Sequence, residues 1–272
     1  MYQKLSFNKA FKQKVKQDIG KGKKLNQEGK IEAIAPGAAV NSPWVFISKG
    51  RHKFCGIYNH VMTQQHDLIP TYCRFKCWKT VIKPRNLKEL FRLHDILTQL
   101  QMPSKCGMDL RDYTFGAWAG FVYACSLPEG QRYWGQMMEA LKEEFGRDQV
   151  SSESSDFPAK VTCILKRGCT EMERLQASDQ WDRAGEEELT LEGMIEDMYA
   201  HNDQDAHQSA WVKNDIMERW VYRGIEIGDP TAREMAEEHC LDPKVWDKLV
   251  VHSVTYHDLD LNKQNEEVDD AA

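Results

Sequence analysis

The spacing of hydrophobic residues between positions 72 and 174 predicts alternating strands and helices. Residues 72–83 are rich in aromatic and β-branched side chains and stop before Pro84, which is typical of a strand. After Asn86, which can cap a helix, leucines and other apolar residues recur at helical spacing until Pro103. The same patterns predict strands over residues 106–113, 117–126 and 160–173, and a helix over residues 127–145.

This βαββαβ order of elements is that of a ferredoxin-like domain. We therefore predict an α+β fold: a ferredoxin-like antiparallel sheet followed by a C-terminal all-helical unit. The alternative is a larger α+β sheet that recruits residues 44–48 as an extra strand. RNA-binding modules of this plan expose base-stacking aromatic residues on the central strands. Alanines fill several of those positions here, so we interpret Phe121 and Tyr123 as core residues.

From residue 189 to residue 257 the hydrophobic spacing becomes helical. One helix carries a single apolar stripe, made of Val212, Ile216, Trp220 and Val221. Residues 228–231 are predicted to end that helix and to start the next one.

Residues 231–253 resemble a helix-turn-helix, with the small residue Ala236 in the first helix and Leu241 in the turn. The resemblance implies DNA contact by the second helix, through Lys244 and Lys248. The alternative is a unit that packs internally or docks a protein partner, because Asp242 and Asp247 offset these lysines.

The two ends of the chain carry opposite charge. Residues 1–30 hold nine lysines against Asp18 and Glu28, whereas residues 258–272 hold six acids and one lysine. Such segments bury few apolar groups, and the lysines are either solvated or form an arm that contacts phosphates. The predicted organisation is a basic N-terminal arm (1–40), a ferredoxin-like domain (41–180), a helical unit (186–257) and an acidic disordered tail (258–272).

Composition excludes several classes of protein. The 272 residues have a net charge of -6 and a mean hydropathy of -0.63, and no apolar run is long enough to span a membrane. The first residues lack the apolar stretch of a secretory signal, so we expect a cytoplasmic protein, in the host cytoplasm if it is viral. Phosphate-binding Walker loops and the GxGxxG, GxSxG, HExxH and zinc-deaminase patterns are absent from the sequence.

The cysteines suggest a metal site. Cys55, Cys73 and Cys77 fall within 23 residues that also contain His60 and His66, and Cys106 begins the next predicted strand. Thiolates are ligands that zinc prefers, and positions 73 and 77 of an ideal strand face the same side. The set Cys55, Cys73, Cys77 and Cys106 is therefore a candidate structural zinc site. Buried unligated cysteines, or an iron–sulfur or catalytic thiol, are the alternatives.

Three polar stretches with a central glycine adjoin the predicted strands, at residues 49–53, 105–111 and 166–171. Strand alternation places Arg167, Cys169 and Glu171 on one side, and Asp109 and Arg111 share a face of their own strand. Such a set offers a nucleophile, a base and cations for acyl or phosphoryl transfer. The glycines at 50, 107 and 168 would let a ligand approach the backbone closely, and they would equally permit β-bulges. The alternative is a surface ion-pair network.

The stretch at 166–171, with the loop Arg51, His52 and Lys53, resembles bacteriophage transferases that hypermodify DNA pyrimidines. The resemblance implies transfer of an amino acid or amine to an activated pyrimidine in DNA. Glu171 would be the base and Cys169 the nucleophile. The anion-binding and supporting residues would be Lys166, Arg167, Arg111, Asp109 and the loop Arg51, His52 and Lys53.

The second hypothesis is a non-catalytic module that binds nucleic acid or a protein through the C-terminal helices. Zinc would stabilise this module if the cysteines bind it. The two hypotheses differ in what Glu171→Ala should do. An enzyme would fold and lose activity, whereas a binding module would keep its function.

Overall fold

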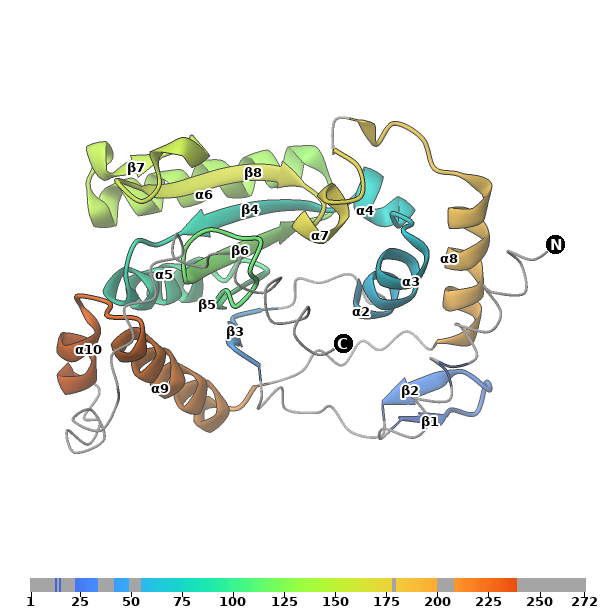
Figure 1. Cartoon of the computed structure of the whole chain (residues 1–272), viewed down its shortest axis with the longest axis horizontal. Coiled ribbons are helices and arrows are strands. Elements are labelled where there is room, and N and C mark those ends of the chain that lie inside the picture. The colour runs from blue at the N-terminus through green and yellow to red at the C-terminus, as the bar shows by residue number, and fades with distance from the viewer. Residues whose placement is uncertain are drawn as a thin grey trace, which may run out of the picture.

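The computed structural model describes residues 13, 15, 23–33, 42–48, 55–177, 180–199 and 208–238. At its centre is a six-stranded sheet in the order β3-β5-β6-β4-β8-β7 (Figure 1). Its strands are β3 (Trp44–Phe46), β4 (Trp78–Lys83), β5 (Ser104–Met108), β6 (Trp118–Ala124), β7 (Val150–Ser151) and β8 (Val161–Arg167). A separate hairpin pairs β1 (Lys23–Leu25) with β2 (Ile31–Ala33). The fold is therefore mixed α+β, as predicted.

Two long helices, α5 (Leu87–Leu100) and α6 (Leu127–Phe145), cover one face of the sheet (Figure 1). The side chains of Asn86 and Ser126 cap them by accepting hydrogen bonds from the backbone of Glu89 and Glu129. Their apolar stripes join the sheet in the largest hydrophobic cluster, where Leu93, Leu97, Met137 and Leu141 are fully buried. The bounds of α6 coincide with the predicted helix.

The sheet differs from the four-stranded antiparallel one that we predicted. β3 and β7 extend it at opposite edges, so the order over six strands differs, and β7 and β8 are parallel. The alternative with residues 44–48 as an added strand is confirmed by β3. Gly107 makes this pairing possible, because a Cβ there would collide with the carbonyl oxygen of Pro43, just before β3.

The predicted strand over residues 72–83 is shorter than expected. Residues 71–75 form helix α4 (Thr71–Phe75), and only β4 is extended, so Cys73 and Cys77 do not share one strand. The ion pair between Arg74 and Glu188 and the hydrogen bonds from Thr71 to Glu192 anchor α4, and these distant contacts override the local strand propensity.

The opposite face of the sheet is partly covered by short elements. These are α2 (Cys55–Ile57), the π-helix η1 (Tyr58–Thr63) and α7 (Thr170–Glu173), and α3 (Gln64–His66) follows η1 directly. Helix α8 (Glu186–Met198) packs on η1 in a second cluster that contains Tyr58, Met62, Leu191 and Ile195. Two 3-10 turns, η2 (Arg147–Gln149) and η3 (Ser154–Asp156), flank β7.

Helices α9 (Ala210–Glu226) and α10 (Ala232–Glu238) pack beside α5 and β3 (Figure 1). The predicted stripe of α9 is confirmed, because Val212, Ile216, Trp220 and Val221 are all buried. These residues belong to the same cluster as α5 and the sheet. The second half of the helix-turn-helix resemblance, with Lys244 and Lys248, lies outside the described residues.

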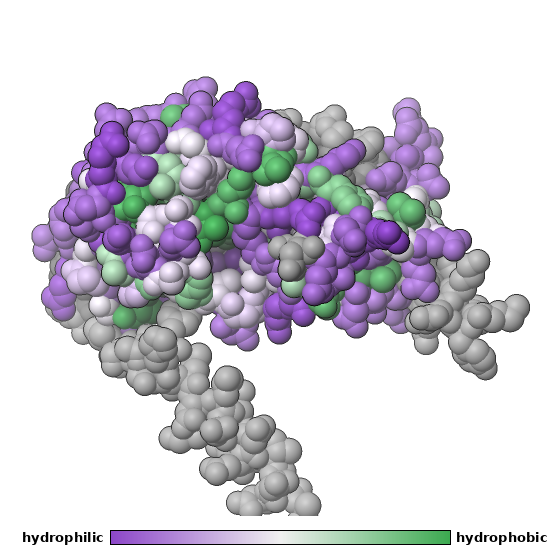
Figure 2. All heavy atoms as spheres, turned by 90° about the horizontal axis from the view of Figure 1, so that it is seen from above, coloured by the Kyte–Doolittle hydropathy of each residue, from purple (hydrophilic) through white to green (hydrophobic). Residues whose placement is uncertain are grey.

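The surface seen from above in Figure 2 is mostly hydrophilic, with hydrophobic side chains in broken patches near its middle. Within the described part of the chain, no helix has the length and apolar character needed to cross a membrane.

Candidate active site

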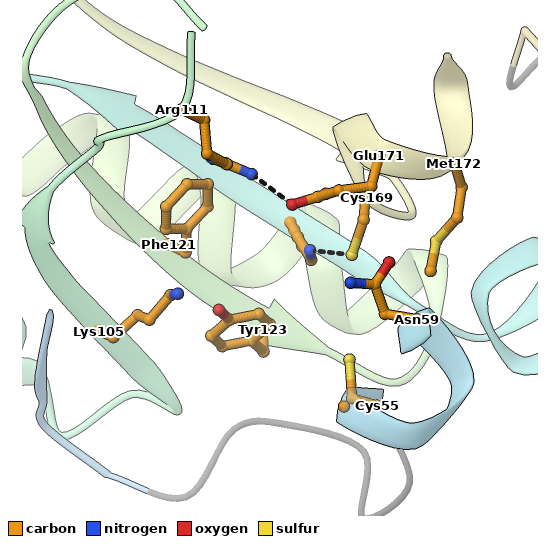
Figure 3. Close-up of a pocket in the computed structure, with 11 residues that line it drawn as sticks. Cys55, Asn59, Lys105, Arg111, Phe121, Tyr123, Cys169, Glu171 and Met172 are labelled. Carbon is orange, nitrogen blue, oxygen red and sulfur yellow. Dashed lines mark hydrogen bonds and ion pairs between the residues drawn. The ribbon is translucent and has the colours of Figure 1, made fainter. Parts of the chain in front are cut away.

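A pocket that is partly open to solvent lies over the face of the sheet opposite α5 and α6 (Figure 3). Its empty space, counted together with the solvent at its mouth, is about 510 Å³. Its floor comes from β4, β5 and β6, and its walls come from α2, η1 and α7. The lining residues are Cys55, Gly56, Asn59, Lys79, Lys105, Arg111, Phe121, Tyr123, Cys169, Glu171 and Met172. Cations, a carboxylate, thiols and aromatic rings therefore face one space.

A lysine–cysteine pair lies at the centre of the pocket. The Nζ of Lys79 donates a hydrogen bond of 2.6 Å to the Sγ of Cys169. A hydrogen bond from Cys55 and the positive charge of Lys79 outweigh burial and lower the pKa of the Cys169 thiol to about 5. Burial alone would lower the pKa of Lys79, but the negative charge of Cys169 raises it well above its usual value. Cys169 is therefore a thiolate at neutral pH, which is the nucleophilic form of cysteine.

Gly168 turns the chain so that Cys169 faces the pocket. It has a φ of 69°, and a Cβ at this position would collide with the ring of Trp181. Its backbone N–H donates to the carbonyl oxygen of Cys77 at 2.8 Å, so the chain end after β8 is held against the start of β4. Our prediction that Arg167, Cys169 and Glu171 lie on one strand was wrong, because β8 ends at Arg167 and α7 follows.

A chain of ion pairs forms the second part of the site. The guanidinium of Arg111 contacts both oxygens of Asp109, at 2.7 and 2.9 Å, and its Nη1 lies 2.8 Å from the Oε1 of Glu171. Lys83 contacts the same Asp109 carboxylate at 2.9 Å, and both of these side chains are buried. Asp109 therefore holds Arg111 from behind while Arg111 reaches Glu171 at the pocket.

The carboxylates in this chain are ionised at neutral pH. Burial would raise the pKa of Asp109, but hydrogen bonds from Arg111 and the charge of Lys83 bring it down to about 2. Burial opposes ionisation of Glu171 as well, and its backbone hydrogen bond and the nearby Arg111 lower the pKa of that carboxyl below its ordinary value. Glu171 is consequently a weak base while Arg111 contacts it.

Phe121 and Tyr123 line the pocket. Both lie on the open face of β6, where Tyr123 pairs in register with Lys79 and Phe121 pairs with Lys105. Phe121 is 7% exposed, but it lies outside the three hydrophobic clusters found among the described residues. The interpretation as core is confirmed for Phe121, which is buried although it also lines the pocket, whereas Tyr123 is only half-buried.

Asn59 adds an amide to the same pocket. It lies on η1, and its side chain points toward Cys169 and the pocket (Figure 3). Its Oδ1 is buried and has no hydrogen-bond partner in the described structure. Buried polar atoms are usually paired, so an unpaired oxygen here is consistent with a place for a ligand N–H.

The structure gathers part of the predicted set. Arg111, Cys169 and Glu171 line the pocket, with Asp109 behind them. Lys166 forms an ion pair with Glu173 instead, and the guanidinium of Arg167 lies 5.7 Å from the ring of Trp181. Arg51, His52 and Lys53 fall outside the described residues, with Gly50. Gly107 and Gly168 allow close packing of the chain itself, rather than of a ligand.

The four cysteines proposed for zinc are not all brought together, because Cys73 lies near Cys77 and Cys55 whereas Cys106 is buried elsewhere. Cys55 lines the pocket, whereas Cys106 is buried in the main cluster with α5. Cys73 packs with Met172 and Trp181, and its hydrogen bond with Cys77 together with burial raises the pKa of its thiol. Burial likewise raises the pKa of Cys106. Across the described ranges, no group of three or more His, Cys, Asp and Glu side chains is placed to hold a metal ion.

Sequence reasoning missed Lys79 and Asn59, and it included Lys105 only as the first residue of the polar stretch 105–111, without a role. Lys79 and Lys83 alternate with Thr80 and Ile82 on β4, so two lysines on one face of a sheet strand were the available signal. No comparable signal pointed to Asn59, because no secondary structure was predicted for its segment.

No known family matches the chain. No similar protein was found among curated proteins or among solved structures, so the function has to be argued from the site itself.

Proposed function

We propose that this protein is a group-transfer enzyme in which Cys169 is the nucleophile and the substrate is an anion. The observation that carries this proposal is the 2.6 Å contact between Lys79 and Cys169 on the floor of an open pocket. A thiolate paired with a desolvated lysine is an activated nucleophile. Lys105 and Arg111 beside it favour a negatively charged substrate.

The specific reaction we propose is transfer of an amine to an activated pyrimidine of DNA. The Sγ of Cys169 adds to C6 of a pyrimidine whose C5 methylene carries a phosphate ester. The electron pair released into the ring expels the phosphate and leaves an exocyclic methylene. The amine nitrogen adds to that carbon and loses a proton, and Cys169 then departs from C6, which restores the ring and the thiolate.

The chain's residues have distinct roles in this proposal. Arg111 would hold the departing phosphate, and Asp109 is a positioning residue that fixes Arg111. When the phosphate binds Arg111, the ion pair between Arg111 and Glu171 weakens, and the Glu171 carboxylate becomes more basic. Glu171 would then accept the proton of the amine. The unpaired Oδ1 of Asn59 offers an acceptor for an N–H of the base or of the amine.

Three expectations from the sequence also remain proposals. The inner strands β5, β6, β4 and β8 with α5 and α6 support a ferredoxin-like unit to which β3 and β7 are added, since β4 lies between β6 and β8. DNA contact by the basic arm and by residues 231–253 belongs to the same hypothesis. The division of the chain into an arm, an α+β domain, a helical unit and a tail is also a proposal.

The first test is the reactivity of the thiol. Iodoacetamide at pH 6 should alkylate Cys169 faster than the exposed Cys125, measured by peptide mass spectrometry over time. The second test incubates DNA containing phosphorylated 5-hydroxymethyluracil with a mixture of amino acids and polyamines. Nucleoside mass spectrometry should detect an amine adduct with wild-type protein and none with Cys169→Ser. Equal alkylation of the two cysteines would remove the nucleophile from the proposal.

A second candidate, a non-catalytic anion-binding module, is favoured by the way Asp109 and Glu171 neutralise Arg111 within the protein. Under that hypothesis Cys169→Ser would bind DNA as tightly as the wild type, and no adduct would form with either protein.

A further inference from the structure

Lys105 is held in place by aromatic rings at one side of the pocket. Its Nζ lies 3.9 Å from the ring centroid of Trp44 and 5.3 Å from that of Phe121. The two rings contact each other edge to face, with centroids 5.4 Å apart. Lys105 is 8% exposed, so its ammonium is largely removed from water and faces the electron-rich rings.

A second cation approaches the same ring. The guanidinium carbon of Arg111 lies 5.7 Å from the centroid of Phe121. Figure 3 shows the ends of Lys105 and Arg111 pointing into the pocket from either side of Phe121, with the hydroxyl of Tyr123 beside Lys105. The backbone fixes this arrangement, because Lys105 pairs in register with Phe121 across β5 and β6, and Asp109 holds Arg111.

Arg111 is paired with Asp109 and Glu171, so a ligand that took the place of Glu171 would meet the guanidinium of Arg111 and the ammonium of Lys105. A dianionic group there would accept hydrogen bonds from both cations. Arg111 offers a planar fork that suits a phosphate, and Lys105 offers a compact charge.

We propose that Lys105 and Arg111, on either side of Phe121, form the subsite for the phosphate or pyrophosphate leaving group of the substrate. This inference rests on the proposed function and deepens it, because it adds Lys105 to the residues that would hold the leaving group. The subsite lies in the same pocket as the Sγ of Cys169, so the reacting ring would bridge the cations and the thiolate. Lys105 thereby becomes a substrate-binding residue, a role that the sequence did not indicate.

The experiment measures protection of Cys169 by inorganic pyrophosphate. The rate of iodoacetamide alkylation of Cys169 is followed against pyrophosphate concentration in the wild type, Lys105→Met, Lys105→Arg and Lys160→Met. Lys160→Met is the matched control, because Lys160 lies at the surface and pairs with Asp156. Pyrophosphate should slow alkylation in the wild type and in Lys160→Met. Lys105→Met should weaken that protection about tenfold or more, and Lys105→Arg should restore part of it.

The outcomes separate this inference from the proposed function. Equal protection in Lys105→Met and wild type overturns the subsite, even if Cys169 is reactive. A slow, unprotected Cys169 would defeat the proposed function, and direct calorimetric titration of pyrophosphate into the wild type and Lys105→Met would still decide the subsite. A third arm uses a thymidine oligonucleotide without terminal phosphates. Protection by the oligonucleotide and none by pyrophosphate would assign the cations to the DNA backbone and overturn the leaving-group assignment.

Discussion

The ammonium of Lys79 contacts the sulfur of Cys169, although 90 residues separate them in sequence. β4 supplies the lysine, and the turn at Gly168 returns the cysteine to it. Because each charge stabilises the other, the reactivity of the thiol should depend on the lysine.

Lys79→Met should raise the pKa of Cys169 from about 5 toward the ordinary value of a thiol, because the nearest positive charge is removed. The midpoint of the alkylation rate against pH should rise by more than about one unit, and the rate at pH 6 should fall about tenfold. Iodoacetamide alkylation rates recorded between pH 4 and pH 9 give both the midpoint and the rate at pH 6.

Lys79→Arg keeps a positive charge and should retain a depressed midpoint. Lys166→Met removes the neighbouring cation in register on β8, which is paired with Glu173, and should leave the profile in place. A profile that Lys79→Met does not move would show that Cys55 alone sustains the thiolate.

Asp109→Asn should destabilise the fold strongly, because Lys83 and Arg111 would lose the carboxylate that both contact. Breaking a buried pair by removing one partner costs about 3–5 kcal/mol. Urea denaturation at pH 7, followed by tryptophan fluorescence, measures the loss. Lys160→Met removes an exposed pair and should change the free energy of unfolding by less than about 1 kcal/mol.

The same carboxylate gives a pH dependence. The folded-state pKa of about 2 lies below the ordinary 3.8, so ionised Asp109 stabilises the protein above the ordinary value. That stability is lost as the pH falls from about 4 toward 2. The wild type should therefore show a steeper loss of stability in this interval than Asp109→Asn, and parallel curves would contradict the assignment.

Asn59→Leu should separate stability from binding. The buried Oδ1 lacks a partner, so replacing the amide by an apolar group should leave the free energy of unfolding unchanged or raise it by about 1 kcal/mol. Formation of the amine adduct should fall about tenfold, because a substrate N–H loses its acceptor.

Thr80→Val is the matched control for Asn59→Leu. The Thr80 Oγ1 is also buried without a partner in the described structure, but Thr80 does not line the pocket. It should be equally tolerated in denaturation experiments while leaving adduct formation intact. Full activity in Asn59→Leu would exclude the amide from the site.

Ile216→Ala should weaken the sheet as well as α9, because Ile216 is fully buried in the cluster shared with α5 and β6. A cavity of this kind costs about 2–5 kcal/mol. Hydrogen exchange should show the loss in β5 and β6 along with α9. Trp211→Ala, at a position 71% exposed on the same helix, should change little. Exchange that rises in α9 alone would support an independent helical unit.

Local patterns predicted the elements whose stability is mainly local. Helix α6 has Pro128 in its first turn and Gly146 after its end, and its predicted bounds agree with these signals. Ser126, which we predicted as the last residue of a strand, caps the helix. The apolar stripe of α9 was also predicted from its helical spacing. In both cases the helical period and the termini agree with the tertiary structure.

Elements fixed by distant contacts could not be predicted in the same way. The aromatic residues before β4 are typical of a strand, yet Glu188 and Glu192 of α8 hold Arg74 and Thr71 in a helix. For the site, Arg111, Cys169 and Glu171 were found from their chemistry. Lys79 resembled an ordinary strand residue, and Lys105 belonged to the polar stretch 105–111 without a role of its own. The sheet register places them beside Tyr123 and Phe121.

Edge strand β3 is held by hydrogen bonds from residues distant in sequence. Gln208 bonds the backbone on both sides of Val45, and the indole of Trp220 donates to the carbonyl oxygen of Pro43. Trp44, whose ring lies against Lys105, is thus secured by residues more than 160 positions away. A fragment that stops before Gln208 would lose the hydrogen bonds that hold β3, and with them the support that Trp44 gives to Lys105 at the pocket.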